Sequence, residues 1–185
     1  MALAHNGNLV NAANLREELE AQGAQFATTM DTEIIAKILE QQSDRPLEET
    51  FLDILRRVQG AYSLVMMTRD TLIAMRDPNG VRPLCIGKLR ESLSTQDGSE
   101  NIVEGYVVAS ETCALNVVGA EYVREVEPGE IVFINGDGIE SVRLTEELPH
   151  IENRPALCVF EFIYLARPDS SLLGMNVHHA RRRMG

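Results

Sequence analysis

His5-Asn6-Gly7-Asn8-Leu9 stands near the amino terminus of this 185-residue chain, and Thr29-Met30-Asp31-Thr32-Glu33 follows it, with Asp31 25 residues after Asn6. A glycine beside an asparagine predicts a turn whose backbone N–H groups can approach a ligand closely, and the asparagine amide adds another donor. Asn6 and Gly7 therefore have the chemistry of an oxyanion hole. An acid such as Asp31 could hold the ammonium group of the same ligand. Together the two segments predict a pocket for a small zwitterion.

Each of these residues also has a purely structural interpretation. Asn-Gly pairs are common in turns, and His5 fits equally well as a core histidine. Asp31 precedes an apolar run of helical periodicity, and an aspartate at a helix start most often accepts backbone N–H bonds as a cap. The local pattern alone leaves both interpretations open.

The first sixty residues predict three amphipathic helices. Asn11 and Gly23 suit the N-cap and the left-handed C-terminal stop of the first helix. Thr29 or Asp31 caps the second, and Pro46 occupies the first turn of the third. Apolar residues recur at helical spacing in each helix: Leu15 and Leu19, then Ile34, Ile35, Ile38 and Leu39, then Leu47, Phe51, Ile54, Leu55 and Val58.

After Gly60 the pattern changes to short β-like runs between turn residues. The predicted strands are residues 61–68, 71–76, 83–88, 106–110, 121–126, 130–135 and 138–144. Asp77-Pro78-Asn79-Gly80 and Asn135-Gly136-Asp137-Gly138 have hairpin-turn chemistry, and residues 90–104 look like a polar surface loop. Helices first and strands afterwards predict the α+β class rather than alternating βαβ units.

Length and composition fit a globular protein with one complete core and the edge of a second domain. The hydrophobic content of 44% and the charged content of 24% are ordinary for such a protein. From about Pro149 the chain changes to an apolar and aromatic run, residues 158–166, and ends in basic residues. We predict one domain over residues 1–150, then a linker and the start of a second domain over residues 151–185.

Charge and cysteine content exclude several protein classes. Lys+Arg 17 against Asp+Glu 28 gives a net charge of −11, which argues against binding to nucleic acid phosphates. The sequence shows no signal-peptide pattern and no apolar run long enough to span a membrane. Cys85, Cys113 and Cys158 are odd in number and widely spaced, so they predict neither a disulfide framework nor a zinc site. We therefore expect a cytoplasmic protein with no nucleic acid or membrane partner.

Two further segments have candidate chemistry that a structural interpretation explains better. Gly80, Arg82 and Pro83 lack the spacing of a phosphate-binding loop, and a hairpin turn accounts for them. Ser110-Glu111-Thr112-Cys113 lacks the glycine framing of a nucleophile elbow. Ser110 or Thr112 more simply caps a short helix through Leu115.

Six segments, in one order and one spacing, carry a resemblance to a known family. They are His5-Asn6-Gly7-Asn8-Leu9, the Asp31-Thr32-Glu33 segment, Gly60-Ala61-Tyr62, Asp77-Pro78-Asn79-Gly80-Val81-Arg82-Pro83-Leu84, Ala109-Ser110-Glu111-Thr112-Cys113-Ala114 and Arg124-Glu125-Val126-Glu127-Pro128-Gly129-Glu130. The set resembles the amidophosphoribosyltransferases, a family of class II glutamine amidotransferases. Tyr164-Leu165-Ala166-Arg167-Pro168-Asp169-Ser170 is similar to the entrance of that family's phosphoribosyltransferase domain.

The resemblance implies an N-terminal-nucleophile hydrolase fold, an αββα sandwich of two antiparallel sheets between helix layers. It also implies a part in the first committed step of purine synthesis. A terminal cysteine thiolate attacks the glutamine amide with its own α-amino group as base, and the ammonia displaces pyrophosphate from phosphoribosyl pyrophosphate to give 5-phosphoribosylamine. Asn6 and Gly7 match the family's oxyanion donors, and Asp31 matches the acid that binds the glutamine α-amino group.

Several parts that the resemblance implies are absent from the sequence. The nucleophilic cysteine and the arginine that holds the glutamine carboxylate are expected upstream of His5, and the pyrophosphate-binding loop is expected after Gly185. Removal of Met1 would expose Ala2, whose methyl group cannot attack an amide. We therefore predict a fragment, truncated at its amino terminus, that does not hydrolyse glutamine by itself.

Cofactors and partners are also implied by the resemblance. Mg²⁺ is expected for the phosphoribosyltransferase domain, and a homodimer or homotetramer for the full enzyme. Cys158 resembles a position that ligates a [4Fe–4S] cluster in some members, a task for four thiolates, so within this chain a buried thiol is expected. His178-His179 and the basic run Arg181-Arg182-Arg183 could suggest metal or phosphate binding, but such a run usually marks a solvated helix.

Two classes of function stay open at this point. The first is an enzyme, as part of an amidophosphoribosyltransferase. Its relatives glucosamine-6-phosphate synthase and asparagine synthetase share the Asn-Gly pair and the acid, but residues 77–84 and 167–170 favour the purine enzyme. The second is a non-catalytic binding or interaction module that keeps the fold.

Overall fold

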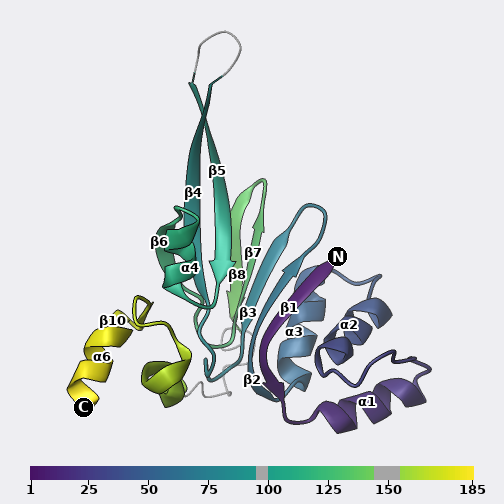
Figure 1. Cartoon of the computed structure of the whole chain (residues 1–185). Helices are drawn as coiled ribbons and strands as arrows, with labels where there is room; N and C mark the ends of the chain where they lie inside the picture. The colour runs from purple at the N-terminus through teal and green to yellow at the C-terminus, as the bar shows by residue number, and fades with distance from the viewer. Residues whose placement is uncertain (95–99, 144–154) are drawn as a thin grey trace. The chain divides into compact units, whose positions relative to one another are not determined.

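The computed structural model describes residues 1–94, 100–143 and 155–185, and the chain divides into two compact units (Figure 1). The first unit comprises Met1–Arg82 with Glu127–Ala156. The second comprises Pro83–Val126 with Leu157–Gly185. Among the described residues, no helix has the length and apolarity needed to cross a membrane.

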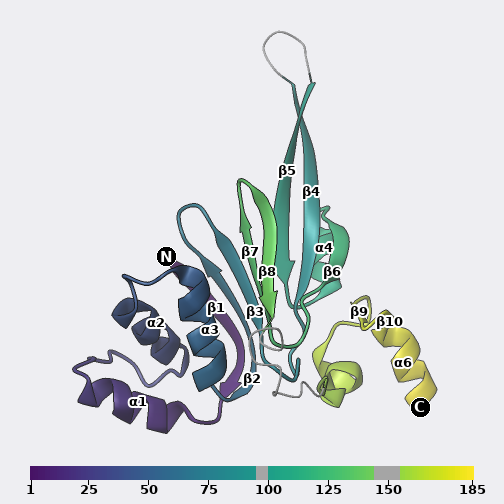
Figure 2. The same ribbon diagram turned by 180° about the vertical axis from the view of Figure 1, so that it is seen from behind.

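The first unit contains a five-stranded antiparallel sheet and three helices. The strands, in the order β1-β2-β3-β7-β8, are β1 (Ala2–Leu9), β2 (Gly60–Met67), β3 (Leu72–Arg76), β7 (Glu130–Asn135) and β8 (Gly138–Arg143). The helices are α1 (Ala12–Ala21), α2 (Thr32–Gln41) and α3 (Leu47–Arg57). All three helices lie on the same side of β1 and β2 in both views (Figures 1 and 2).

The main core lies between this sheet and the helices. The β2 residues Tyr62, Leu64 and Met66 alternate toward the helices and are almost fully buried, as expected for a strand with one face on a core. The apolar stripes predicted for the helices meet them, except that Leu47 is 40% exposed and lies outside the core. The other predicted residues all belong to the same cluster: Leu15, Leu19, Ile34, Ile35, Ile38, Leu39, Phe51, Ile54, Leu55 and Val58. The three helices predicted from periodicity are therefore confirmed.

The predicted side-chain caps at Asn11 and Asp31 are wrong, whereas Gly23 ends the first helix with φ +95°, as predicted. Neither Asn11 nor Asp31 makes a side-chain bond to the N–H groups of the helix that it precedes. Asn11 instead donates to Arg57 O at 2.9 Å and accepts from Gln59 N at 2.9 Å. It thereby joins the start of α1 to the end of α3, a contact across more than forty residues that no local signal encodes.

The turn predicted at Asn6-Gly7 is also wrong, because these residues lie inside strand β1. Asn6 pairs with Ser63 and Gly7 with Tyr62, in a register that runs without a break from Ala2 to Leu9. Gly7 has φ +149°, and a Cβ atom there would lie 2.0 Å from Ala61 O. Glycine is therefore needed for close approach of two strands and not for a reversal of the chain.

The second unit contains a three-stranded antiparallel sheet in the order β5-β4-β6. Its strands are β4 (Cys85–Ser94), β5 (Glu100–Ala109) and β6 (Glu121–Glu125), and helix α4 (Thr112–Val117) packs on them. The remaining elements are the π-helix η1 (Glu161–Leu165), the short hairpin of β9 (Ser171–Leu172) and β10 (Met175–Asn176), and helix α6 (Val177–Met184).

Three predictions concern the connecting segments. The loop predicted at 90–104 is wrong, because β4 continues to Ser94 and β5 begins at Glu100, while residues 95–99 lie outside the described part. The helix through Leu115 is confirmed, but its N-cap is Glu111 and no side chain caps it. The predicted domain boundary near residue 150 falls in 144–154, which also lies outside the described residues.

The Asp77-Pro78-Asn79-Gly80 segment is a turn but not a hairpin. Gly80 N donates to Asp77 O at 2.9 Å, and Gly80 has φ +62°, which is the turn chemistry expected of Asn-Gly. The strand before it, β3, belongs to the five-stranded sheet, whereas the strand after it, β4, belongs to the other sheet. Asn135 to Gly138 does close a hairpin, between β7 and β8.

Candidate functional site

The open side of strand β1 presents the Gly7 N–H group. Val10 N donates to Gln59 O at 2.8 Å, whereas Leu9 N turns the other way and donates to the Asp31 carboxylate. Alternate residues of an antiparallel strand point their N–H groups to opposite sides, so the Gly7 N–H lies on the same side as that of Leu9. Since β1 is the first strand in the sheet order, no other described strand covers this side.

The Asp31 carboxylate lies at the same side of β1. Its Oδ2 accepts from Leu9 N at 3.0 Å, and its Oδ1 lies 3.4 Å from Thr32 Oγ1 and 3.5 Å from His5 Nδ1. The side chain is 24% exposed, so a solute can reach the carboxylate. Asp31 immediately precedes helix α2, but its carboxylate binds the strand that holds Asn6 and Gly7 and not the N–H groups of the helix.

Glu33 organises the segment that leads into Asp31. Its carboxylate accepts from Ala27 N at 2.7 Å, from Thr28 N at 2.8 Å and from Thr28 Oγ1 at 2.6 Å. The Thr28 hydroxyl and these backbone donors hold the pKa of Glu33 below its usual value. The sequence analysis did not single out this role, although a glutamate in the first helical turn is a common partner for upstream backbone donors.

His5 is a buried histidine between β1 and α2. Its side chain is 4% exposed, and Nδ1 lies 3.0 Å from Thr32 Oγ1. Burial lowers the pKa of His5, and the nearby Asp31 carboxylate only partly opposes this effect. The ring is therefore neutral at pH 7, and the core interpretation of His5 fits the structure.

Asn6 is held by a residue that is distant in the sequence, Arg82. Asn6 is half-buried, and its Oδ1 accepts from Arg82 Nε at 3.2 Å. In the sequence, Arg82 belongs to a turn segment with no visible connection to Asn6. The two residues are 76 positions apart, so no local spacing could have joined them.

A sequence model of the glutamine amidotransferase domain matches residues 1–101. This range contains the Asn6-Gly7 pair, Asp31 and Arg82, and it covers more than half of the chain. The chain belongs to the glutamine amidotransferase domain family.

Curated relatives of this glutamine amidotransferase domain are longer proteins. The chain is 44% identical over 185 residues to an amidophosphoribosyltransferase of Bacillus subtilis (strain 168), and 40% identical to one of Staphylococcus aureus (strain N315). In each comparison the whole chain aligns. It spans 35% of the Bacillus protein and 34% of the Staphylococcus protein, about a third of each.

Solved structures of the family have the same fold. Glutamine phosphoribosylpyrophosphate amidotransferase from B. subtilis, in complex with ADP and GMP, matches 96% of this chain and 35% of its own, with 44% identity and a TM-score of 0.80. An enzyme described as the allosteric regulatory enzyme of purine biosynthesis matches with 43% identity and a TM-score of 0.79, over 96% of this chain and 34% of its own. These matches confirm the predicted α+β sandwich class.

Among the residues that the structure describes, Cys158 has no neighbours with which it could form a metal site. Its thiol is half-buried, Cys85 and Cys113 are buried, and none of the three is in a disulfide bond. Within residues 1–94, 100–143 and 155–185, no three His, Cys, Asp or Glu side chains are grouped so that they could hold a metal ion. A [4Fe–4S] cluster needs four ligands, so the described residues do not fit that group.

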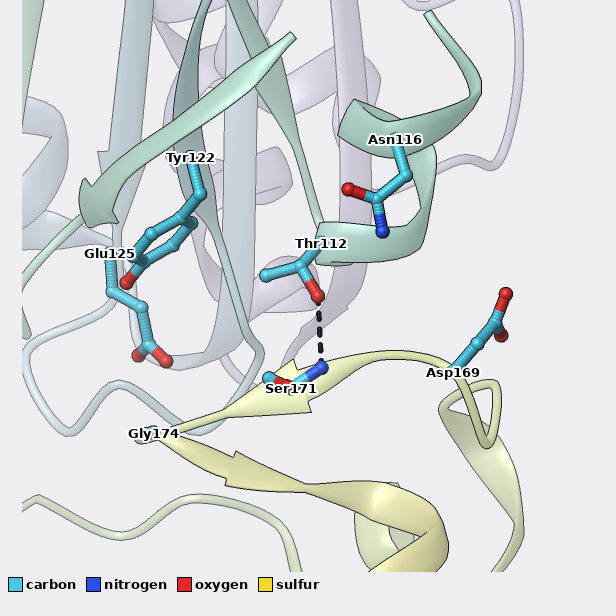
Figure 3. A pocket seen from close by; sticks show the side chains of 7 residues that line it. All are labelled: Thr112, Asn116, Tyr122, Glu125, Asp169, Ser171 and Gly174. Carbon is cyan, nitrogen blue, oxygen red and sulfur yellow. Dashed lines mark hydrogen bonds between the residues drawn. The ribbon is translucent and has the colours of Figure 1, made fainter. Parts of the chain in front are cut away.

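The second unit of the amidotransferase chain has a polar cavity of about 300 Å³ (Figure 3). Its lining residues are Thr112, Asn116, Tyr122, Glu125, Asp169, Ser171 and Gly174. Several of its polar groups already bind within the chain: Thr112 Oγ1 accepts from Ser171 N at 2.9 Å, Glu125 accepts from Leu173 N at 2.6 Å, and Asp169 pairs with Arg167 at 3.0 Å. The polar lining is therefore explained by hydrogen bonds within the chain, two of which connect α4 and β6 to the β9–β10 hairpin.

Proposed function

We propose that this chain forms the glutamine-binding part of an amidophosphoribosyltransferase. The proposed reaction transfers the amide nitrogen of glutamine, as ammonia, to phosphoribosyl pyrophosphate, which loses pyrophosphate and becomes 5-phosphoribosylamine. This is the first committed step of purine synthesis. The observation that carries the proposal is that the Asp31 carboxylate binds strand β1, which carries Asn6 and Gly7, within the family match.

The geometry suits a glutamine molecule laid along β1. The Gly7 N–H and the Asn6 side-chain amide are the donors for the oxygen that becomes negative when the glutamine amide is attacked. The Leu9 N–H, bound to Asp31, lies two residues further on, or about 7 Å along the strand. This spacing is comparable with the length of a glutamine side chain, so Asp31 can hold the α-ammonium group of the same molecule.

The nucleophile in the proposed reaction is a cysteine at a protein amino terminus, where the free α-amino group serves as base. Cys85, Cys113 and Cys158 are internal residues and carry no such amine. None of them is assigned the role. The described residues supply the oxyanion donors and the ammonium-binding acid.

The proposal extends to the setting of the reaction. The resemblance supports Mg²⁺ in the phosphoribosyl transfer step and a homo-oligomeric full enzyme. A [4Fe–4S] cluster at Cys158 is proposed only where the full enzyme supplies the other three thiolates. Three cysteines outside any disulfide bond support a reducing compartment such as the cytoplasm. Both substrates are small molecules, in keeping with a protein whose net charge of −11 disfavours nucleic acid.

A chimera tests the proposal directly. The 185 residues replace the aligned segment of the B. subtilis relative, and phosphoribosylamine formation is measured with glutamine and, separately, with ammonia. We expect Asn6→Ala to lower glutamine-dependent kcat by about 10²-fold to 10³-fold, because one oxyanion donor is lost. Ammonia-dependent synthesis should continue at its normal rate, since ammonia bypasses the glutaminase step.

Asn8→Ala is the matched control. Asn8 has an exposed side chain on the same face of β1 as Asn6, two residues along the strand. This variant should leave both activities unchanged. Equal loss of the glutamine and ammonia activities in Asn6→Ala would make Asn6 a structural residue and would contradict the proposed role.

A further inference from the structure

The contact between Arg82 and Asn6 determines which way the Asn6 amide faces. Arg82 Nε lies 3.2 Å from Asn6 Oδ1. A guanidinium group can only donate hydrogen bonds, whereas an asparagine amide has one accepting end and one donating end. The oxygen of Asn6 therefore faces Arg82, and the Nδ2 group is the end turned away from the guanidinium. An oxyanion donor needs this orientation, because the opposite one would present an oxygen to a developing negative charge.

The backbone of Arg82 is itself held in place by buried side chains. Its carbonyl oxygen accepts from Ser63 Oγ at 3.1 Å and from Arg76 Nε at 2.8 Å. Ser63 is 3% exposed and stands directly opposite Asn6 in the β1–β2 register, and Arg76 is 2% exposed. Arg82 is thus tied to the neighbouring strands β2 and β3 of the sheet that carries Asn6.

The turn before Arg82 is equally constrained. The fully buried Asp77 carboxylate accepts from Asn79 N and Val81 N, each at 2.9 Å. Arg76 Nη2 donates to Gly80 O at 3.0 Å. These bonds fix the backbone that leads into Arg82. A reactive group held by residues that are themselves locked in this way is preorganised.

We propose that Arg82 is a positioning residue for the glutaminase step, which fixes the Asn6 amide with its nitrogen toward the glutamine oxyanion. The inference rests on the proposed function and adds to it a residue that does not touch the substrate. The positive charge of Arg82 on Oδ1 also polarises the amide, which strengthens its N–H groups as donors. Loss of the Arg82 donor weakens this orientation, and an incorrectly turned amide would repel the oxyanion.

The test is a double-mutant cycle in the chimera with the B. subtilis relative. Arg82→Met keeps much of the apolar stem and removes the donor. We expect a fall of about 10-fold to 10²-fold in glutamine-dependent kcat, with the KM for glutamine and the ammonia-dependent rate unchanged. In an Asn6→Ala background, Arg82→Met should cost nothing further, because the group that it positions is already absent.

Two further variants separate positioning from folding. Arg82→Lys keeps a charged donor, so it should restore most of the rate lost in Arg82→Met. Arg69→Met removes an exposed arginine from the turn between β2 and β3 of the same unit and should leave both activities unchanged. If Arg82→Met unfolds the protein, the Arg82→Lys variant still decides: a loss as large as that of Asn6→Ala would overturn the proposal.

The outcomes distinguish this inference from the function on which it rests. Additive losses in the cycle, or a fall in ammonia-dependent synthesis, would overturn the positioning role of Arg82 while the role of Asn6 stands. An Asn6→Ala variant with normal glutamine activity would overturn the proposed function, and the positioning role with it. A loss confined to glutamine-dependent kcat and absent in the Asn6→Ala background supports both.

Discussion

The Asp31 side chain bonds to a distant backbone N–H group and does not cap the helix that it precedes. The sequence favours a helix cap, yet Oδ2 accepts from Leu9 N, 22 residues away, and the carboxylate stays 24% exposed. A charged acceptor fixed at one oxygen and open to solvent suits an ammonium ligand. As a helix cap, the Asp31 carboxylate would instead bond to the first N–H groups of α2.

This difference gives a prediction for Asp31→Asn in the chimera. The amide oxygen can still accept from Leu9 N, so the strand contact survives, but the charge is lost. A hydrogen bond to a charged group contributes about 1.5–3 kcal/mol, so the KM for glutamine should rise by about 10-fold to 10²-fold with little change in kcat. Steady-state kinetics with glutamine as the varied substrate measure this.

Asp44→Asn is the control for that change. Asp44 is an exposed acid of the same unit, before α3, and its replacement removes one negative charge without touching β1. The KM for glutamine should stay constant. An unchanged KM in Asp31→Asn together with a lower melting temperature would reduce Asp31 to a structural link between β1 and α2.

Among the elements, strand β1 is not predicted from local sequence. Asn6, Gly7 and Asn8 all have low strand propensity, so their local pattern predicts a loop. Their extended conformation comes from pairing with β2, more than fifty residues further on. The helices are recovered correctly because a 3.6-residue apolar period is a local signal, whereas the polar ends of β4 and β5 carry no such pattern and were missed.

Strand pairing predicts the effect of Gly7→Ala on the 185-residue chain. The added methyl group would lie 2.0 Å from Ala61 O, and φ +149° is a conformation that alanine rarely adopts. We expect the free energy of unfolding to fall by about 2 kcal/mol or more. Urea denaturation followed by circular dichroism measures this quantity.

Gly136→Ala provides the comparison for Gly7→Ala. Gly136 lies in the β7–β8 turn of the same sheet, and a Cβ atom there meets nothing within 4 Å. Its replacement should change the free energy of unfolding by no more than about 0.5 kcal/mol. If the two alanine variants proved equally stable, the close approach of β1 and β2 at Gly7 would be refuted.

At the scale of the whole molecule, the candidate site lies entirely within one of two compact units. Asn6, Gly7, Asp31 and Arg82 all belong to the first unit and to the family match over residues 1–101. The resemblance predicted Asn6, Gly7 and Asp31, because they lie in two short continuous motifs. It could not predict Arg82, whose contact with Asn6 depends on the packing of β3 and its turn beside β1 and β2.

Glutamine hydrolysis can be compared between these 185 residues alone and the same residues within a longer relative. Glutamine hydrolysis as proposed needs a thiolate beside a free α-amine, and each of the three cysteines here is internal. A polypeptide of these residues alone should therefore release no ammonia from glutamine above the blank, although β1 and Asp31 are in place. The chimera with the B. subtilis relative, 44% identical over this segment, should release it in step with phosphoribosylamine formation. A coupled glutamate dehydrogenase assay follows the ammonia from both proteins, and steady turnover by the 185 residues alone would refute the assignment of the nucleophile.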